Sequence, residues 1–402
     1  MKRRRVKITG IGPVTPAGVG LEEFWTGILQ PVSRIRPFTK LGEDLGPFVA
    51  AYIDDFRIER FLPKHDIPKG AARHTQFAIA ASVLAIRDSG IPISRFAELN
   101  AVVVAGACVM DFDGIIRTIE GVNAKGAKGA FGRGIYTTNA ATIAATISDV
   151  LDLKARSISV QSSCCTGLDA VGHAARLVAN GEADIAICGG SDAPLYKCPL
   201  VELRSVGMTP ETTENADKLN RPFDLWRTTG VVSEGASMFV IEPESSERPG
   251  YSYIDGYAYA NDSSDNLCGG MGVAMNMALA DARKRAHDVD SISAWGPGHR
   301  LIDAAESREI CRIFGRNLET IPTVSLKGAI GNPLGAAPAI QVAAAALSQR
   351  HSLIPPTVNW RHADPECPLR LSASVVSVEH ETTLINAHGI SGVNSCLLLT
   401  RC

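Results

Sequence analysis

The stretch from residue 157 to residue 191 constrains the fold more than any other, because its periodicity changes twice. Residues 157–161 alternate as in a strand, and from Gly167 the apolar side chains recur at helical spacing. Asn180 and the glycine after it end that helix where a left-handed cap is expected. A short apolar strand, 184–188, follows. The pattern predicts a strand, a tight turn, a helix and a second strand.

Two cysteines, Cys164 and Cys165, lie in the predicted turn. Unpaired N–H groups and the helix dipole lower the pKa of a thiol at a helix N-terminus. Because the thiolate is the nucleophilic form of cysteine, a covalent acyl-enzyme cysteine would belong in this turn. The alternative is that both side chains are buried small apolar residues, as most free cysteines are.

The composition limits the classes of function. The 402 residues are 45% hydrophobic and 20% charged with a net charge of −2, which predicts a globular protein with an ample core and no nucleic-acid footprint. The ten cysteines form no C-x-x-C pair, which argues against a metal site or a disulfide framework and favours a reducing cytoplasm. We expect no cofactor. No apolar run is long enough for the core of a signal peptide or for a membrane span, so neither of these is expected.

The first half of the chain contains further strands and helices. Residues 10–18 hold two prolines and lack the glycine spacing of a phosphate loop, so a structural turn is predicted there. Residues 31–66 carry mixed charge and are expected to be irregular. The patterns otherwise predict strands at 6–9, 101–108 and 237–241 and helices at 21–29, 70–89 and 138–151.

The second half repeats this plan. Its small-residue helix at 335–350 occupies the same place as the helix after Cys164, and small side chains would let the two helices pack closely. Two similar halves, 1–245 and 246–402, predict a duplicated layered α/β fold. The remaining predictions are helices at 272–285 and 304–314 and strands from Tyr251, near Ile292 and at 323–325, 374–378, 383–386 and 395–400.

Seven motifs spread over essentially the whole chain resemble the β-ketoacyl-acyl-carrier-protein synthases, the condensing enzymes of the thiolase superfamily. This resemblance implies a five-layer α/β/α/β/α fold, a dimer and a nucleophile three residues before the elbow glycine, which is Cys164. Cys165 then fills a pocket position usually held by alanine. The motifs are Cys164-Cys165-Thr166-Gly167, Arg221-Pro-Phe-Asp, Ser233-Glu-Gly-Ala, Asp303 with Glu306, Leu326-Lys327-Gly, Gly335-Ala-Ala and Pro355-Pro-Thr-Val-Asn.

The chain departs from the family at its histidines. The two that would bind the malonyl carboxylate and assist decarboxylation fall on Trp295 and Asn332. His299 lies in the first loop but is displaced by four residues. In the C-terminal loop, His388 and Ile390 replace two phenylalanines, the second of which gates the pocket in relatives. These losses also resemble the chain-length factors, the non-condensing partner subunits of type II polyketide synthases, which normally lose the cysteine as well.

Acylation of Cys164 would need only a thiolate and an oxyanion site, which the backbone N–H groups of Cys164 and of the loop near Ile390 can supply. Asn332 can still donate a hydrogen bond, but Trp295 has one donor and no proton to relay. We therefore expect an acyl-thioester transferase of type II polyketide or fatty-acid biosynthesis with weak or absent condensation. The alternative is a chain-length-factor-like partner of an active ketosynthase, as a heterodimer rather than a homodimer.

Two side chains near the predicted site have open roles. Lys327 either pairs with a loop carboxylate such as Glu306 or takes part in proton transfer. His388 either replaces a core phenylalanine without a chemical role or serves as a general base toward Cys164. His299 is expected to be a plain loop residue.

An acidic acyl carrier protein would need a basic rim to dock on. The candidates are Lys64, Lys69 and Arg73, at the start of the helix where relatives bind their carrier, and Arg204. An ordinary solvated charged surface is the alternative for each of the four.

Overall fold

A computed structural model describes residues 3–41, 45–132 and 134–402. One large mixed sheet runs through the molecule in the order β11-β10-β14-β15-β9-β1-β8-β7-β5-β6, with β2 paired to β1, and two small sheets join β3 to β4 and β12 to β13. The strands are β1 (Val6–Thr15), β2 (Gly18–Val19), β3 (Ile35–Phe38), β4 (Phe48–Ala51), β5 (Ala101–Gly106), β6 (Arg156–Ser159), β7 (Ile185–Asp192), β8 (Gly235–Pro243), β9 (Ser252–Asn261), β10 (Ser291–Ser293), β11 (Thr323–Val324), β12 (Leu353–Ile354), β13 (Val376–Ser377), β14 (Thr382–His388) and β15 (Val393–Arg401).

The helices follow the strands in alternation through both halves of the chain. None of those described has the length and apolar character needed to cross a bilayer. They are α1 (Leu21–Leu29), α2 (Arg73–Ser89), α3 (Phe112–Lys125), α4 (Gly134–Thr137), α5 (Ile143–Val150), α6 (Thr166–Ala179), α7 (Lys197–Ser205), α8 (Gly269–Asp281), α9 (Arg300–Phe314), α10 (Lys327–Ile330) and α11 (Ala337–His351).

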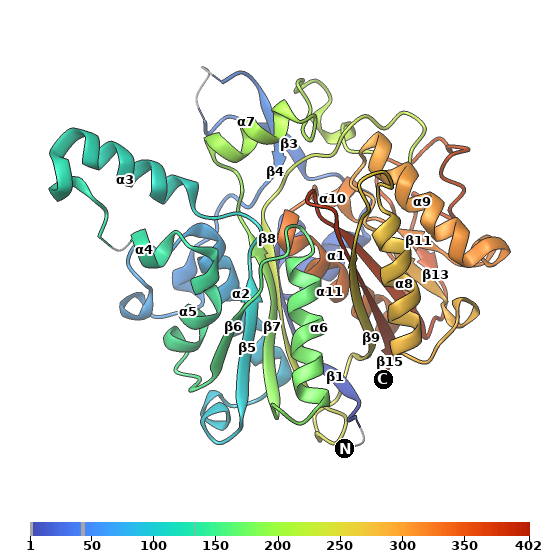
Figure 1. Ribbon diagram of the computed structural model, residues 1–402, viewed down its shortest axis with the longest axis horizontal. Helices are drawn as coiled ribbons and strands as arrows, with labels where there is room; N and C mark the ends of the chain where they lie inside the picture. The colour runs from blue at the N-terminus through green and yellow to red at the C-terminus, as the bar shows by residue number, and fades with distance from the viewer. Residues whose placement is uncertain (1–2, 42–44, 133) are drawn as a thin grey trace.

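The elements form five layers, as the family resemblance implies (Figure 1). Strands β1, β8, β7, β5 and β6 make one half of the sheet, and β9, β15, β14, β10 and β11 make the other. A single pair, Lys7 with Tyr253, joins the halves between β1 and β9. Helices α6 and α11 lie between the halves, α2 and α5 cover one outer face, and α8 and α9 cover the other. The predicted mixed α/β architecture is confirmed.

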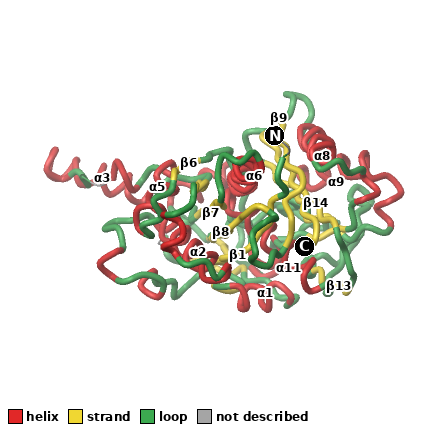
Figure 2. The backbone as a smooth tube through the Cα atoms, turned by 90° about the horizontal axis from the view of Figure 1, so that it is seen from below, coloured by secondary structure: helices red, strands yellow, loops and turns green. Residues whose placement is uncertain are grey.

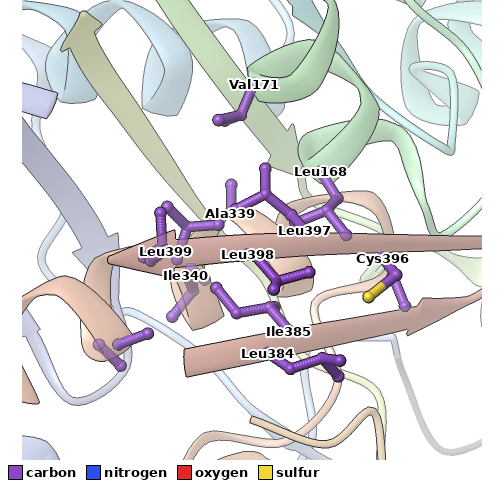
Figure 3. Packing of buried hydrophobic residues seen from close by; sticks show 14 of the residues in the cluster. Leu168, Val171, Ala339, Ile340, Leu384, Ile385, Cys396, Leu397, Leu398 and Leu399 are labelled. Atoms are coloured by element: carbon purple, nitrogen blue, oxygen red, sulfur yellow. The ribbon is translucent and has the colours of Figure 1, made fainter. Parts of the chain in front are cut away.

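The middle layer is tight because its helices carry small residues. A Cβ built on Gly167 of α6 would lie 2.6 Å from the carbonyl oxygen of Gly335 and 2.9 Å from the Cβ of Ala339, so glycine is required at this crossing. Figure 3 shows Leu168 of α6 beside Leu397 of β15 in the buried cluster. Burying one such leucine contributes about 2 kcal/mol. The core therefore fixes the start of α6, where the elbow lies.

Several predicted boundaries need correction. Strand β1 continues through residues 10–15, where a turn was predicted, because a bulge between Ile8 and Gly10 and one-sided pairing with β8 accommodate Pro13. Residues 31–66, predicted as irregular, contain the β3–β4 pair. Helix α2 begins at Arg73 rather than at residue 70, and Gly90 caps it with a φ of +68°.

Two features are exposed at one end of the molecule, a projecting helix and an edge strand. Helix α3 extends away from the other layers in both views (Figures 1 and 2), and Ile119 and Val122 on it are exposed. Strand β6 lies at the end of the large sheet, with all four residues exposed, and pairs only with β5 among the described strands. An unpaired strand edge of this kind is a template for pairing with another chain.

Candidate active site

Cys164 lies in the elbow between β6 and α6 and is 2% exposed. The turn depends on Ser163, which takes a positive φ of +54° although it is not glycine, a conformation that side chains avoid unless their surroundings impose it. The amide of Cys165 donates to the Ser162 carbonyl at 3.1 Å, and that of Thr166 donates to the Ser163 carbonyl at 3.2 Å. Helix α6 thus begins two residues after the cysteine predicted as the nucleophile.

The loop after β14 covers the elbow. A Cβ on Gly389 would lie 2.9 Å from the Cβ of Ser163 and 3.3 Å from the amide nitrogen of Cys164, so only glycine allows this approach. The next N–H group, from Ile390, donates toward the Cys164 sulfur, while the Ile390 side chain is 57% exposed. The site therefore has a backbone donor directed at the sulfur of the predicted nucleophile.

The Cys164 sulfur also contacts a second thiol that sequence reasoning missed, that of Cys108. The hydrogen bond from Cys108 lowers the pKa of Cys164, and the N–H of Ile390 adds to this, whereas burial and the carboxylate of Asp192 oppose it. The sequence alone gave little indication of this contact. Cys108 follows β5, and only the pairing of β5 with β6, the strand before the elbow, brings the two thiols together.

Cys165 has a different environment. Its thiol donates to the carbonyl oxygen of Val393 at 3.3 Å. Burial, with the nearby carboxylate of Asp169, raises the pKa of Cys165 well above its ordinary value. The Cys165 thiol consequently stays protonated, whereas the lowered pKa of Cys164 favours its thiolate form.

Trp295 is fully buried next to α10. Its amide donates to Glu306 Oε1 at 2.8 Å, and the amide of Gly296 donates to Glu306 Oε2 at 2.7 Å. The indole ring lies under the ammonium of Lys327, whose Nζ is 3.8 Å from the ring centroid. The tryptophan therefore combines with the lysine in a cation–π contact and fills the space beneath it.

Lys327 does not form the carboxylate pair expected from the sequence. Its Nζ donates to the carbonyl oxygen of Trp295 and, at 3.3 Å, to Gln341 Oε1, and no ion pair within 4 Å joins it to Glu306 in the described part of the chain. Burial lowers the pKa of Lys327 to about 7, although Glu306 acts in the opposite direction. Neutral acceptors and an aromatic face hold this amine because they tolerate both of its protonation states.

Asn332 lies in the loop between α10 and α11 and is 6% exposed. The backbone N–H of Asn332 donates to the Val231 carbonyl oxygen at 2.7 Å, and its backbone carbonyl oxygen accepts from the N–H of Ser233 at 3.0 Å. The side-chain Oδ1 of Asn332 is buried and has no hydrogen-bond donor in the described part of the chain. Because a buried acceptor is costly when unpaired, a bound group that donates a hydrogen bond would suit this position.

His388 does not reach Cys164 in the way the sequence suggested. Its Nδ1 lies 2.8 Å from Oδ1 of Asn394, its register partner, and Asn394 donates to Asp262 Oδ1 at 2.7 Å. The next residue on β15, Ser395, faces the other way and donates to Asp169 of α6. His388 thus lies on the α8 face of the sheet, opposite the face that carries α6, and the predicted role as a base toward Cys164 loses its geometric support.

His299 immediately precedes α9, away from the thiol pair. Its carbonyl accepts the amide of Asp303 at 2.9 Å, and its Nδ1 is buried without a partner in the described residues. Burial, with the nearby guanidinium of Arg227, lowers the pKa of His299. This environment agrees with a loop residue that stays neutral.

Two family models cover most of the chain. The beta-ketoacyl synthase N-terminal domain matches residues 3–247, and the C-terminal domain of the same family matches residues 251–361. The chain belongs to the β-ketoacyl synthase family.

Relatives and solved structures agree with this family. The tetracenomycin polyketide synthase ketoacyl synthase alpha subunit of Streptomyces glaucescens is 28% identical over 99% of this chain and 97% of its own length. The ishigamide ketosynthase/chain length factor has a TM-score of 0.90 at 28% identity, with both chains fully covered. The type II PKS acyl-carrier protein complex of AntDE:AntF, with its ketosynthase bound to the hexaketide, has a TM-score of 0.89 at 26% identity over the full length of both chains.

Two of the four basic residues predicted for carrier docking, Arg73 and Arg204, make contacts within the protein. Arg73 donates from Nε and Nη2 to the carboxylate of Glu234, both at 2.7 Å. Arg204 donates to the carbonyl oxygen of Leu45 at 3.2 Å, and its guanidinium lies 3.6 Å from the ring centroid of Phe48. These internal bonds hold the two arginines in place, so the prediction that they offer free charge to a carrier is not supported.

The two lysines of that set remain on the surface. Lys64 and Lys69 are exposed and line a cleft of about 1060 Å³ between the start of α2 and α3. The same cleft carries the carboxylates of Asp111 and Asp113. The cleft therefore has mixed charge, and the assignment of Lys64 and Lys69 to carrier docking stays a prediction.

Proposed function

We propose that this β-ketoacyl synthase family chain accepts an acyl group from an acyl carrier protein as a thioester on Cys164, with decarboxylative condensation weak or absent. The observation that carries the proposal is the elbow itself. Cys164 has a lowered pKa, and the N–H of Ile390 is aimed at its sulfur. The setting would be type II polyketide or fatty-acid biosynthesis in the cytoplasm.

The transfer step needs no group beyond those present. The Cys164 thiolate attacks the carbonyl carbon of the carrier thioester, a carbon–sulfur bond forms, and the carbonyl oxygen takes the negative charge. The backbone N–H groups of Cys164 and Ile390 would donate to that oxygen, and one such donor is worth about 3 kcal/mol in comparable sites. The intermediate collapses and expels the thiolate of the carrier's prosthetic arm, which takes a proton from solvent.

Condensation would need more than this. Loss of carbon dioxide from a malonyl thioester leaves an enolate, which the two family histidines are expected to stabilise. Trp295 commits its ring to Lys327, and its backbone N–H to Glu306. Asn332 can donate a hydrogen bond but has no proton to relay at neutral pH. The Trp295 indole N–H and the Asn332 side-chain amide would replace two imidazoles, and neither can relay a proton, so decarboxylation loses most of its assistance.

Intact-mass analysis tests the proposed transfer. The purified protein is incubated with acyl carrier protein loaded with a short and a long acyl chain. We expect a mass increase equal to the acyl group in the native protein and in Cys165→Ala, which removes the neighbouring thiol, and none in Cys164→Ala. An unmodified native protein with both chains, or an adduct that persists in Cys164→Ala, would refute the assignment.

A second function is supported by the exposed edge. Strand β6 and the projecting α3 offer a surface for another subunit, and a partner role as in a ketosynthase/chain length factor pair would use it. Co-expression with a ketosynthase from the same pathway, followed by size-exclusion chromatography, distinguishes the cases. A stable heterodimer with condensing activity that is unchanged by Cys164→Ala would favour the partner role over acyl transfer, whereas a homodimer would favour the first proposal.

A further inference from the structure

The topology places a second thiol at the nucleophile. Strands β5 and β6 are parallel neighbours, with Ala105 opposite Ser159, so their carboxyl ends lie at the same edge of the sheet. A Cβ on Gly106 would lie 1.8 Å from the carbonyl oxygen of Val160, which shows how closely the end of β5 approaches the elbow. Cys108 follows β5 by two residues, and its thiol is in hydrogen-bond contact with that of Cys164.

The backbone around Cys108 is held rigidly. Its amide donates to Asp192 Oδ2 at 2.9 Å, and the amide of Val109 donates to Asp192 Oδ1 at 3.0 Å. The same carboxylate accepts the amide of Gly335 at 2.7 Å, and a Cβ on Gly335 would lie only 3.1 Å from the Cβ of Cys108. Asp192 is fully buried, so this clamp is not shared with solvent. The second thiol is therefore positioned by the fold, as a site residue must be.

We propose that Cys108 is a positioning residue for Cys164: its S–H group donates a hydrogen bond to the Cys164 sulfur and stabilises the thiolate that accepts the acyl group. This inference rests on the proposed function and supplies the activating partner that the missing histidines leave open. No proton leaves Cys108 in the step, and hydrogen bonds to charged acceptors are about twice as strong as neutral ones.

The asymmetry of the surroundings decides which sulfur ionises. Cys164 receives three hydrogen bonds, from Cys108, from the N–H of Ile390 and from the side chain of Ser163, whereas Cys108 receives one, from Ser163. The hydrogen bond to Cys164 is the largest effect raising the pKa of Cys108, and burial adds to it. The charged groups whose fields reach Cys164 from the packed elements are the carboxylate of Asp192 and the ammonium of Lys327. Cys108 consequently keeps the shared proton while Cys164 loses its own.

The test measures how fast iodoacetamide alkylates Cys164 between pH 5.5 and 9.5, using mass spectrometry of the peptide that contains it. Below its pKa, a thiol reacts in proportion to its thiolate fraction. We expect Cys108→Ala to lower the rate at pH 7 by about tenfold and to move the midpoint to higher pH, since one hydrogen bond to a charged group is lost. Cys108→Ser keeps a donor and should restore most of the rate. Cys188→Ala, another buried cysteine, is the matched control.

Superimposable profiles for the native protein and Cys108→Ala would overturn the proposal, as would equal profiles for the serine and alanine variants. If the alanine variant does not fold, diamide oxidation of the native protein still tests the contact. Diamide takes two electrons and two protons from a pair of thiols, and a Cys108–Cys164 disulfide in the unreduced digest is expected. Disulfides of Cys164 with other cysteines alone would contradict the contact. Neither readout needs a carrier or an acyl group, so failure of acyl transfer is a separate result.

Discussion

Replacing Lys327 by methionine should change how the stability of the protein depends on pH. The amine is buried among neutral acceptors and the Trp295 ring, and burial lowers its pKa from 10.5 to about 7. In the unfolded chain the same lysine titrates near its ordinary value. At pH values between these two pKa values the unfolded state binds more protons than the folded state. The free energy of unfolding therefore rises with pH in this window, and this gain is lost as the pH falls toward 7.

The size of the effect follows from the shift. One pKa unit corresponds to about 1.4 kcal/mol, so the full depression has an upper limit of about 5 kcal/mol across the window. At pH 7 the lysine of the folded protein is half protonated. Between pH 7 and pH 9 the free energy of unfolding of the native protein should therefore increase by about 2 kcal/mol relative to that of Lys327→Met. The absolute offset between the proteins is not diagnostic, because methionine also leaves two acceptors without their donor.

The assay is urea unfolding at pH 7, 8 and 9 for the native protein, Lys327→Met and Lys64→Met, an exposed lysine that serves as the control. Only Lys327→Met should flatten the dependence on pH. If its curve runs parallel to that of the native protein, the amine is not buried as a neutral base, and the account of the Trp295–Lys327 contact is wrong.

Three further predictions concern the site. Purified protein should release carbon dioxide from malonyl-carrier at near-background rates, because the proposed function assigns Trp295 and Asn332 to the positions where the family resemblance implies histidines; turnover as fast as that of an active ketosynthase would contradict this. At pH 7, iodoacetamide should modify Cys164 well before Cys165, whose pKa is raised by burial, and peptide mapping that finds the reverse order would reassign the nucleophile. His388→Phe should leave Cys164 alkylation within about twofold yet lower the free energy of unfolding by about 1–3 kcal/mol, because Asn394 keeps a buried oxygen without its partner; a large loss of alkylation with unchanged stability would restore a catalytic role to the histidine.

Local patterns predicted the elbow well. The change from alternating to helical periodicity around Cys164 corresponds to the observed strand, turn and helix within a few residues, and the two small-residue helices do cross at Gly167 and Gly335. These features depend on neighbours in the sequence. The division of the chain at residue 245 stays a prediction.

The partners of the site residues could not be predicted in the same way, because they come from distant segments. Cys108 reaches Cys164 only through the pairing of β5 with β6. One of the two roles left open for His388, a base toward the nucleophile, came from its place on the C-terminal loop, but its register with Asn394 turns it to the opposite face of the sheet. Arg73 begins a helix as expected, yet its charge is satisfied by Glu234, 161 residues away in the sequence.

The open edge at β6 has a consequence for how the protein must be produced. Strand β6 has four exposed residues and one edge without a partner among the described strands, and the projecting α3 separately exposes Ile119 and Val122, so misassembled chains could join and aggregate through these surfaces. A subunit made in excess of whatever covers this edge would become a client of chaperones and proteases. If the proposed partner subunit covers this edge, the abundance of the protein in the cell should follow the supply of that subunit, and loss of the subunit would be seen first as loss of this protein.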